Sequence, residues 1–542
     1  MTDRRRHTRP PGRPPHRRQP EPAAATRRPF LQEPAGWLLL AVVALYVGLA
    51  WVTCGRAEWW ALGVVDGQQV FAIDDAWRYY LAKTAWTDPA LYHWSYLLPG
   101  AAAADGLLAT LTAGELWLMR ALHAIAGGAT LWLVYLTGLQ LGATRRAMTV
   151  SVLLLGLMPL YAFVFLSFYG ENWLTLALAA GIWCFVSGRE RAAVVLFSLL
   201  PLLRPEGIFM LAPLALHLLL QRRFALLALL GAPGFLYALY LLATLERIGD
   251  YMLWRLELAS VLQHAHTEGL RGPWRFFDTF NPLWTVPALC ALALPPMRRW
   301  WPVFAGAALW LAIAIGFVAT RSAFHEGRYY LSVLPALAIG WPLFFAWLGS
   351  LRPSPRFRRG VAVAFGVLSL CVLAEHFLQL DPVKAGFGDR RWPIAGVPAG
   401  RDYFGSLSAA ANQRRANVAA AVAGIVRGNP DIERVLITNT ELFYHLDPAI
   451  EERVPVVYLP TNEAIAGAWL GGAYFGMQPG DPPHAWYRLR MPAPGERKLV
   501  LFQGAPQMAG FSPVHADGLF ALYLVAVDSA PQRAALPPAP AR

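Results

Sequence analysis

The chain has 542 residues, of which 56% are hydrophobic and 15% are charged. That is more apolar side chain than a soluble core needs, so the composition excludes an ordinary soluble protein and predicts an integral membrane protein. Much of the net charge of +13 sits in the N-terminal arm and in short arginine clusters between apolar segments, which indicates membrane topology and no nucleic-acid partner.

The N-terminal arm, residues 1–33, is rich in Arg and Pro and poor in large apolar side chains. Such a segment cannot bury enough apolar surface to fold, so we expect a disordered cytoplasmic tail close to acidic lipid headgroups. A long apolar stretch follows over about 36–53, and no small-residue cleavage site plainly closes it. We therefore expect it to remain as the first helix of a transmembrane domain over 34–380, rather than to be removed as a signal peptide.

The first external loop, residues 55–115, is unusually long and is rich in Trp, Tyr and Asp, which is typical of interfacial helices on the bilayer surface. It carries the adjacent carboxylates Asp74 and Asp75. One member of such a pair can take a proton from an attacking hydroxyl while the other orients a partner or tunes its pKa. The alternative is that Asp74 caps a helix and Asp75 is solvated. We favour the catalytic interpretation because the loop is aromatic and lies close to the membrane.

Further apolar segments predict a bundle of about eleven transmembrane helices. The two predicted helices on either side of residues 204–207 have an alternative interpretation as one broken helix or a re-entrant element. Arginine clusters fall on every second connection, so the positive-inside rule makes those connections cytoplasmic and places the first loop and everything after about Asp381 outside. After a helix that starts near Leu116, the expected helices cover about 147–168, 170–188, 191–203, 207–220, 224–245, 283–296, 301–320, 329–349 and 360–380.

The C-terminal part, residues 381–530, has a mixed composition instead of a membrane-like one. An alanine-rich stretch predicts a helix over 408–427, and apolar runs of strand length predict strands at 435–440, 454–460, 498–502 and 519–527. We expect a small extracytoplasmic α/β domain there, followed by a disordered tail over 531–542. The expected fold class is therefore mainly α, a polytopic transmembrane helical bundle with a small α/β domain at its C-terminal end.

Several polar residues gather at the predicted outer ends of the apolar helices. Cations at such a position can bind the phosphate of an anionic ligand or serve only as structural anchors. Arg204 has two interpretations, a phosphate ligand or the anchor of a turn through Glu206. Glu171 suits catalysis and helix capping equally well, and snorkelling competes with phosphate binding for Arg328. The candidate residues besides the aspartates are Glu171, Arg204, Glu206, His325, Glu326, Arg328 and Tyr329.

One loop group has the residue types of a metal site. His264, His266 and Glu268 have a His-x-His-x-Glu spacing in the loop over 246–282. Without any sign of a supporting shell, a solvated loop explains this spacing better than a divalent metal does. We predict no essential metal and no cofactor.

Four features together resemble the GT-C glycosyltransferases, polytopic enzymes that move a sugar from a polyprenyl-phosphate donor. They are the acidic pair in a long first external loop, the C-terminal extracytoplasmic domain, the Arg-Pro-Glu-Gly turn at 204–207 and the Glu-Gly-Arg-Tyr-Tyr…Leu-Pro run at 326–335. In that superfamily an aspartate of the first external loop deprotonates the acceptor, which implies this role for Asp74 or Asp75.

The resemblance also implies a reaction and a location. It implies an inverting hexosyl- or pentosyltransferase, similar to mannosyl- and arabinosyltransferases, in the cytoplasmic membrane and active in the cell envelope. Its partners would be a polyprenyl-phosphate-linked sugar donor, membrane lipids, and a glycan, lipid or protein acceptor.

Two other functions use many membrane helices. A transporter or flippase would tend to show two related halves with ionisable groups at the midplane, whereas this chain has no internal symmetry and carries its polar residues at the outer face. A polymerase or ligase acting on lipid-linked polysaccharide would be expected to have its key loop later in the chain. The acidic first loop argues for the glycosyltransferase.

Overall fold

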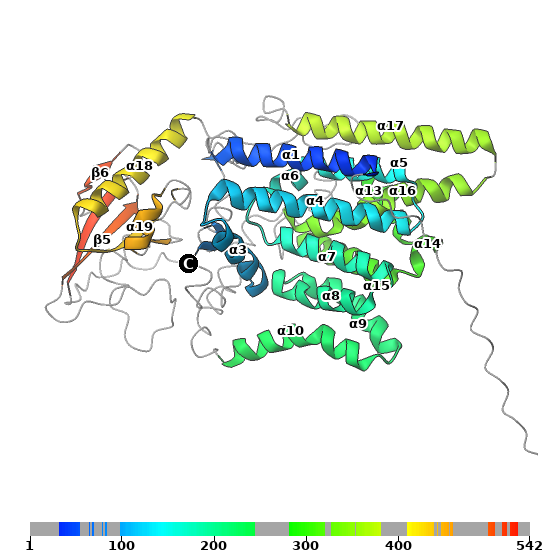
Figure 1. The fold of residues 1–542 in the computed structure, drawn as a ribbon, viewed down its shortest axis with the longest axis horizontal. Helices are drawn as coiled ribbons and strands as arrows, with labels where there is room; N and C mark the ends of the chain where they lie inside the picture. The colour runs from blue at the N-terminus through cyan, green and yellow to red at the C-terminus, as the bar shows by residue number, and fades with distance from the viewer. Residues whose placement is uncertain are drawn as a thin grey trace, which may run out of the picture.

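The computed structural model is mainly helical, and Figure 1 shows its apolar helices running side by side as a bundle. It describes residues 32–54, 64–65, 68–69, 78–79, 82–83, 98–243, 281–319, 327–352, 354–380, 409–437, 442, 446–454, 456–458, 497–504, 512–516 and 521–528. The bundle contains α1 (Pro34–Cys54), α3 (Pro99–Leu111), α4 (Leu116–Gln140), α5 (Arg145–Gly156), α6 (Pro159–Phe165), α7 (Glu171–Val186), α8 (Glu190–Leu203), α9 (Gly207–Leu220), α10 (Phe224–Ala243), α13 (Pro282–Leu292), α14 (Pro295–Arg298), α15 (Trp301–Ala319), the 3-10 helix η5 (Gly327–Val333), α16 (Leu334–Ser350) and α17 (Pro355–Leu380).

Four spans among the described residues are long and apolar enough to cross a membrane. They are Pro34–Trp51, Leu116–Gln140, Tyr329–Ser350 and Pro355–His376, and shorter apolar helices such as α7, α9 and α15 lie among them. Helices pair their own backbone N–H and C=O groups, for which lipid offers no hydrogen-bond partners. The chain is therefore a multi-pass membrane protein, as its composition predicts.

The helices follow the predicted apolar segments closely, but two of those segments are divided. The segment expected over 283–296 is split into α13, which ends at Leu292, and α14, which begins at Pro295. The segment expected as one helix over 147–168 is divided into α5, which ends at Gly156, and α6, which begins at Pro159. Proline has no N–H to donate, so it cannot continue a helix but suits the start of one. The apolar pattern alone does not show this break.

The two helices on either side of residues 204–207, α8 and α9, form a helical hairpin. Glu190 at the start of α8 forms an ion pair with Arg223, which directly precedes α10. The intervening helix α9 therefore returns the chain to the end of the bundle where α8 began, which excludes a single broken helix. Because α8 has 14 residues, the turn lies about 20 Å from that arginine-rich end.

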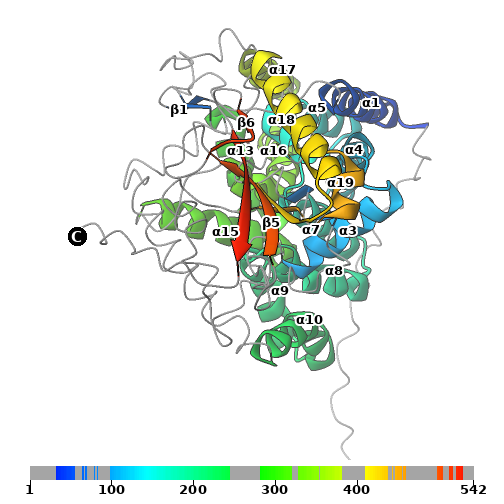
Figure 2. The ribbon, with the colours of Figure 1, turned by 90° about the vertical axis from the view of Figure 1, so that its left-hand side faces the viewer.

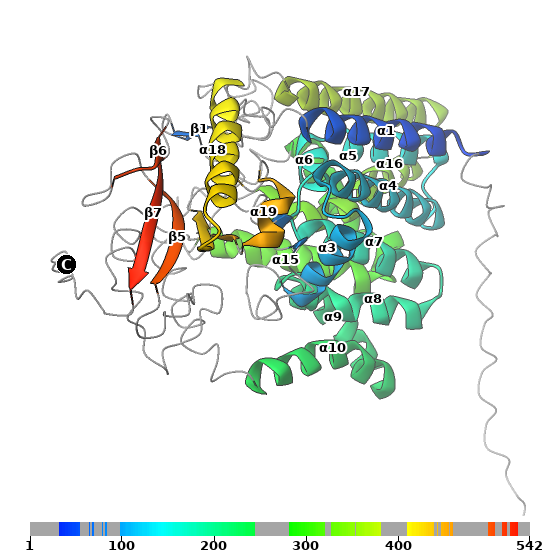
Figure 3. The same cartoon turned by 60° about the vertical axis from the view of Figure 1, so that its left-hand side comes forward.

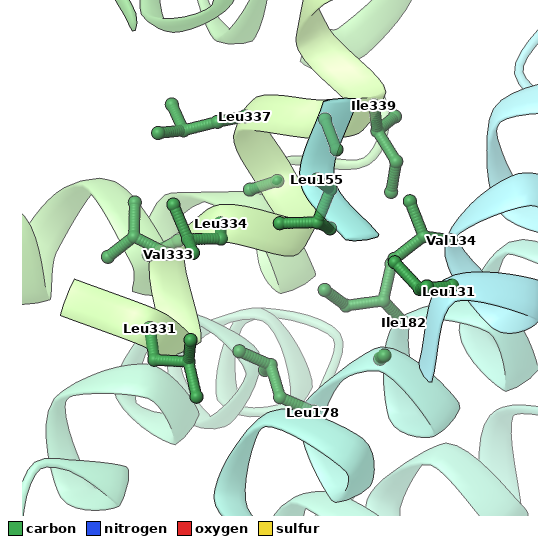
Figure 4. Close-up of a cluster of buried hydrophobic side chains, with 14 of the residues drawn as sticks. Leu131, Val134, Leu155, Leu178, Ile182, Leu331, Val333, Leu334, Leu337 and Ile339 are labelled. Carbon is green, nitrogen blue, oxygen red and sulfur yellow. The ribbon is translucent and has the colours of Figure 1, made fainter. Parts of the chain in front are cut away.

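The bundle core is made of interlocking aliphatic side chains. Figure 4 shows residues of α4, α5, α7, η5 and α16 meeting in the interior, among them the fully buried Leu131, Leu155 and Leu334. Glycines also bring helices together: a Cβ at Gly340 of α16 would lie 2.4 Å from the backbone oxygen of Ala288 in α13. Small residues of this kind let membrane helices pack at close range, where dispersion contacts and not water drive association.

The C-terminal elements form a small α/β unit. β4 (Val456–Tyr458), β3 (Ile432–Ile437), β5 (Arg497–Gly504), β7 (Ala521–Asp528) and β6 (His515–Ala516) form a five-stranded sheet in that order. β3 is parallel to β4 and β5, whereas β7 is antiparallel to β5 and β6. The helices α18 (Ala409–Gly428) and α19 (Pro448–Arg453) share a core with the sheet.

β3, β4, β5, β7 and α18 correspond to the strands and the alanine-rich helix predicted from the sequence, whereas β6 and α19 were not predicted. Figures 1 and 3 show them together at one end of the bundle, and Figure 2 shows α18 and the sheet from that side. The expected fold class, a membrane helical bundle with a small α/β unit, is confirmed. The domain boundaries at 381 and 530 stay predictions.

Candidate active site

A buried cluster of four charged residues lies where α7 begins and α8 ends. Arg78 Nη1 is 3.5 Å from Glu171 Oε2, and Arg204 Nη2 is 3.3 Å from Glu171 Oε1. Arg204 Nε also donates a hydrogen bond of 2.8 Å to Glu206 Oε1. The side chains of Arg78 and Glu171 are 3% and 1% exposed, and those of Arg204 and Glu206 are 15% and 6% exposed. One carboxylate thus holds two guanidinium groups at a nearly closed site.

Local sequence places Glu171 and Arg204 against each other. Glu171 is the first residue of α7, where the positive end of the helix dipole favours a carboxylate. Gly170 before it leaves room for the arginine, because a Cβ at this position would lie 3.2 Å from Arg204 Cδ. The arginine itself follows the last residue of α8, and its backbone N–H still bonds the carbonyl of Leu200. Pro205 then ends the helical run.

The electrostatics of the cluster keep Arg204 charged. Burial alone would lower its pKa, but the carboxylates of Glu171 and Glu206 outweigh burial and raise the pKa of the guanidinium above its usual value. Two cations and two carboxylates make this cluster neutral among its own four side chains. It therefore presents fixed cations without a net buried charge.

Aromatic rings cover the two arginines. The Arg78 guanidinium lies over the ring of Tyr169, 5.1 Å from its centroid, and that of Arg204 lies 5.8 Å from the ring centroid of Tyr329. Trp310 of α15 donates a 2.9 Å hydrogen bond to the backbone oxygen of Tyr329 and so fixes η5. Contacts with aromatic faces stabilise guanidinium groups where water is scarce.

The structure brings together Glu171, Arg204, Glu206 and Tyr329 of the residues predicted from the sequence. Arg204 does pair with Glu206, as the turn-anchor interpretation requires, but it also contacts α7. Arg328 belongs to η5, and its side chain lies outside the described part of the chain. Outside it as well lie Asp74, Asp75, His264, His266, Glu268, His325 and Glu326.

Sequence reasoning missed the role of Arg78 in this cluster. Arg78 follows the acidic pair by three residues, yet its partner Glu171 lies 93 positions further along the chain. It missed also a second buried group beside α7, Asp105 of α3 with His123 of α4. A signal existed for the histidine, because His123 lies in an apolar membrane helix, where ionisable residues usually serve function.

The turn between α8 and α9 depends on Gly207. A Cβ there would lie 2.3 Å from the backbone carbon of Leu200, which belongs to the rigid end of α8. We expect Gly207→Ala to lower stability by about 1–3 kcal/mol because backbone atoms cannot move aside as a flexible side chain can. Thermal unfolding of the detergent-purified chain measures this.

Gly231→Ala is the matched control for that substitution. Gly231 lies within α10, and a Cβ there would meet nothing within 4 Å. Alanine is the better helix former, so this variant should unfold at the wild-type temperature or above it. Equal destabilisation by both substitutions would show that close packing at the turn is unimportant.

No protein-family profile and no curated protein sequence matches the chain. Among solved structures, ArnT from Cupriavidus metallidurans bound to undecaprenyl phosphate matches with a TM-score of 0.53 at 14% identity, over 91% of this chain and 98% of that chain. The apo state of the same protein gives a TM-score of 0.48 at 15% identity, over 89% and 97%. The chain thus shares the fold of ArnT, and the resemblance to GT-C glycosyltransferases is confirmed at the level of the fold.

Proposed function

We propose that the protein is a membrane glycosyltransferase that takes a sugar from a polyprenyl-phosphate donor and transfers it to an extracytoplasmic acceptor. The observation that carries this proposal is that Glu171 holds two arginines, the buried Arg78 and the largely buried Arg204. Arg78 follows Asp75 by three residues. The fold shared with ArnT, whose structure holds undecaprenyl phosphate, supports the same donor class.

The arginines would bind the phosphate of the donor. A guanidinium presents several donors in a fixed plane that matches phosphate oxygens, and it stays charged at any physiological pH. Glu171 would hold Arg78 and Arg204 in position before the donor arrives, so that no side chain has to be ordered on binding. When the sugar leaves, the negative charge grows on the phosphate oxygen, and the same cations would stabilise it.

The acidic pair would supply the base. Asp75 precedes Arg78 by three residues, so the chain allows at most about 11 Å between their Cα atoms. Asp74 or Asp75 would take the proton of an acceptor hydroxyl, whose oxygen then bonds to the anomeric carbon. The bond between that carbon and the phosphate oxygen breaks, polyprenyl phosphate leaves, and the configuration at the carbon inverts.

The location follows from charge. Arg223 and Glu190 mark the end of the bundle opposite to the Arg78–Glu171–Arg204 cluster, and further arginine pairs begin α5 and precede α15. By the positive-inside rule that end would face the cytoplasm of a bacterium-like cell. The site and the α/β unit would then face outward from the inner membrane, where lipid-linked sugars are used for the cell envelope.

The first test is binding of undecaprenyl phosphate to the purified chain. We expect Arg78→Gln to weaken binding about 10–100-fold, because a charge-assisted contact to the phosphate is lost. Arg223→Gln is the matched control, since it also removes an arginine from an ion pair but at the opposite end of the bundle. Its affinity should equal that of the wild type.

Transfer of labelled sugar from a panel of polyprenyl-phosphate sugars to membrane extracts then identifies the donor sugar. Lipid binding that is unaffected by Arg78→Gln would contradict the phosphate site. Tight binding of undecaprenyl phosphate without sugar transfer from any donor would contradict the proposed enzymatic activity and favour a lipid transporter instead.

A further inference from the structure

A second buried polar network lies on the other side of the first turn of α7. His123 of α4 places Nε2 3.1 Å from Asp105 Oδ1 of α3, and both side chains are 0% exposed. Trp173 Nε1 donates a 2.7 Å hydrogen bond to the same Asp105 oxygen. Asn172 Nδ2 lies 2.8 Å from His123 Nδ1 and donates to the backbone oxygen of Ser167 at 2.7 Å. Three helices meet in this network.

The hydrogen-bond directions define the histidine. An amide nitrogen can only donate, so Nδ1 of His123 must accept from Asn172. Nε2 lies on the opposite side of the ring, in close polar contact with Asp105. The imidazole thus accepts a hydrogen bond from α7 and contacts a carboxylate of α3, which no apolar side chain of similar shape can do.

The network is attached to the residues that follow Glu171. Asn172 and Trp173 are the second and third residues of α7, and they bond α4 and α3 while Glu171 contacts the two arginines. Residues one and two positions apart project from different faces of a helix. The first turn of α7 is therefore held on the Asp105–His123 side and on the arginine side at once.

We infer that Asp105 and His123 are positioning residues that set the place of Glu171 and, through it, of Arg78 and Arg204. This inference rests on the proposed function, because it gives the arginines a phosphate to bind. A buried polar pair adds little stability compared with well-packed apolar residues, so stability alone does not explain the network. The network instead fixes the rotation of α7 about its axis, and its position along that axis, at the first turn, which carries the Glu171 carboxylate.

The test uses undecaprenyl phosphate as the probe and the detergent-purified full chain. His123→Phe keeps a flat ring but loses both nitrogens, and Asp105→Leu keeps the size but loses the acceptor. We expect each to weaken lipid binding about tenfold, as losses of supporting residues around a bound group do. Asp105→Asn keeps the Oδ1 acceptor and should bind within about threefold of wild type.

Two controls separate positioning from general damage. Glu375→Gln alters another buried carboxylate, which accepts from Asn281 between α17 and α13, and should leave lipid binding unchanged. In a Glu171→Gln background, His123→Phe should weaken binding by less than about twofold further, because the residue through which it acts is already lost. If His123→Phe weakened lipid binding by the same factor in the Glu171→Gln background as in the wild type, the inference would be overturned.

The outcomes distinguish the two proposals. A wild-type chain that binds no lipid phosphate overturns the proposed function and, with it, this inference. A wild-type chain that binds, together with a folded His123→Phe variant that binds equally well, overturns the inference alone. Binding by Asp105→Asn as weak as that of Asp105→Leu also overturns it, since charge and not hydrogen bonding would then be what matters.

Discussion

Replacing Asp74 and Asp75 together by asparagine is expected to lower the rate of sugar transfer by about 10²–10⁴-fold. Asparagine keeps the shape of each side chain but cannot accept the proton of the acceptor hydroxyl. Binding of undecaprenyl phosphate should remain within about threefold of wild type, because the phosphate contacts assigned to the arginines are intact. Initial rates of transfer in membranes, at saturating donor, measure the effect.

The single variants identify the base, since only one of them should reproduce the loss of the double variant. Asp66→Asn is the matched control, because Asp66 lies in the same first external loop but eight residues before Asp74. A double variant with full transfer activity would exclude the acidic pair from catalysis and leave the phosphate site untouched.

Glu171→Gln has the second large effect, on stability. The substitution leaves the guanidinium of Arg78 buried without this carboxylate and removes one of two carboxylates from Arg204. Loss of one member of a buried ion pair destabilises by about 3 kcal/mol, since the remaining charge is still away from water. A fall in the thermal unfolding temperature of roughly 3 °C is expected for a chain of this size.

The control for that variant is Glu115→Gln. Glu115 likewise lies at the start of a helix of the bundle, directly before α4, but it is exposed and its side chain makes no capping hydrogen bond. The change in stability should stay within about 0.5 kcal/mol. Equal unfolding temperatures for Glu171→Gln and Glu115→Gln would show that the buried ion pairs contribute little to stability.

The membrane architecture could be predicted because lipid leaves few alternatives. Apolar length specifies helices, so α1, α4 and α17 lie where hydropathy predicts them. Strands of the α/β unit followed from short apolar runs such as 435–440 and 498–502. These features depend on properties of neighbouring residues along the chain, which a sequence displays directly.

The candidate site was only partly predictable, because its contacts join distant segments. Glu171, Arg204 and Glu206 stood out as charges beside apolar helices, but the sequence left open whether they meet. The pairing of Arg78 with Glu171, and that of Asp105 with His123, depends on how α3, α4 and α7 rotate against each other. That rotation is set by packing, including the glycine contacts, which periodicity does not encode.

The neutrality of the Arg78–Glu171–Arg204–Glu206 cluster has a consequence for how the protein would select its ligand. Each arginine is already paired with a carboxylate, so a phosphate that enters gains only part of the free energy that two unpaired cations would give it. The hydrocarbon chain would then supply most of the affinity, at about 0.8 kcal/mol for each buried methylene group. Water-soluble sugar phosphates, which are abundant in any cell, would be ignored even though they carry the same reactive group.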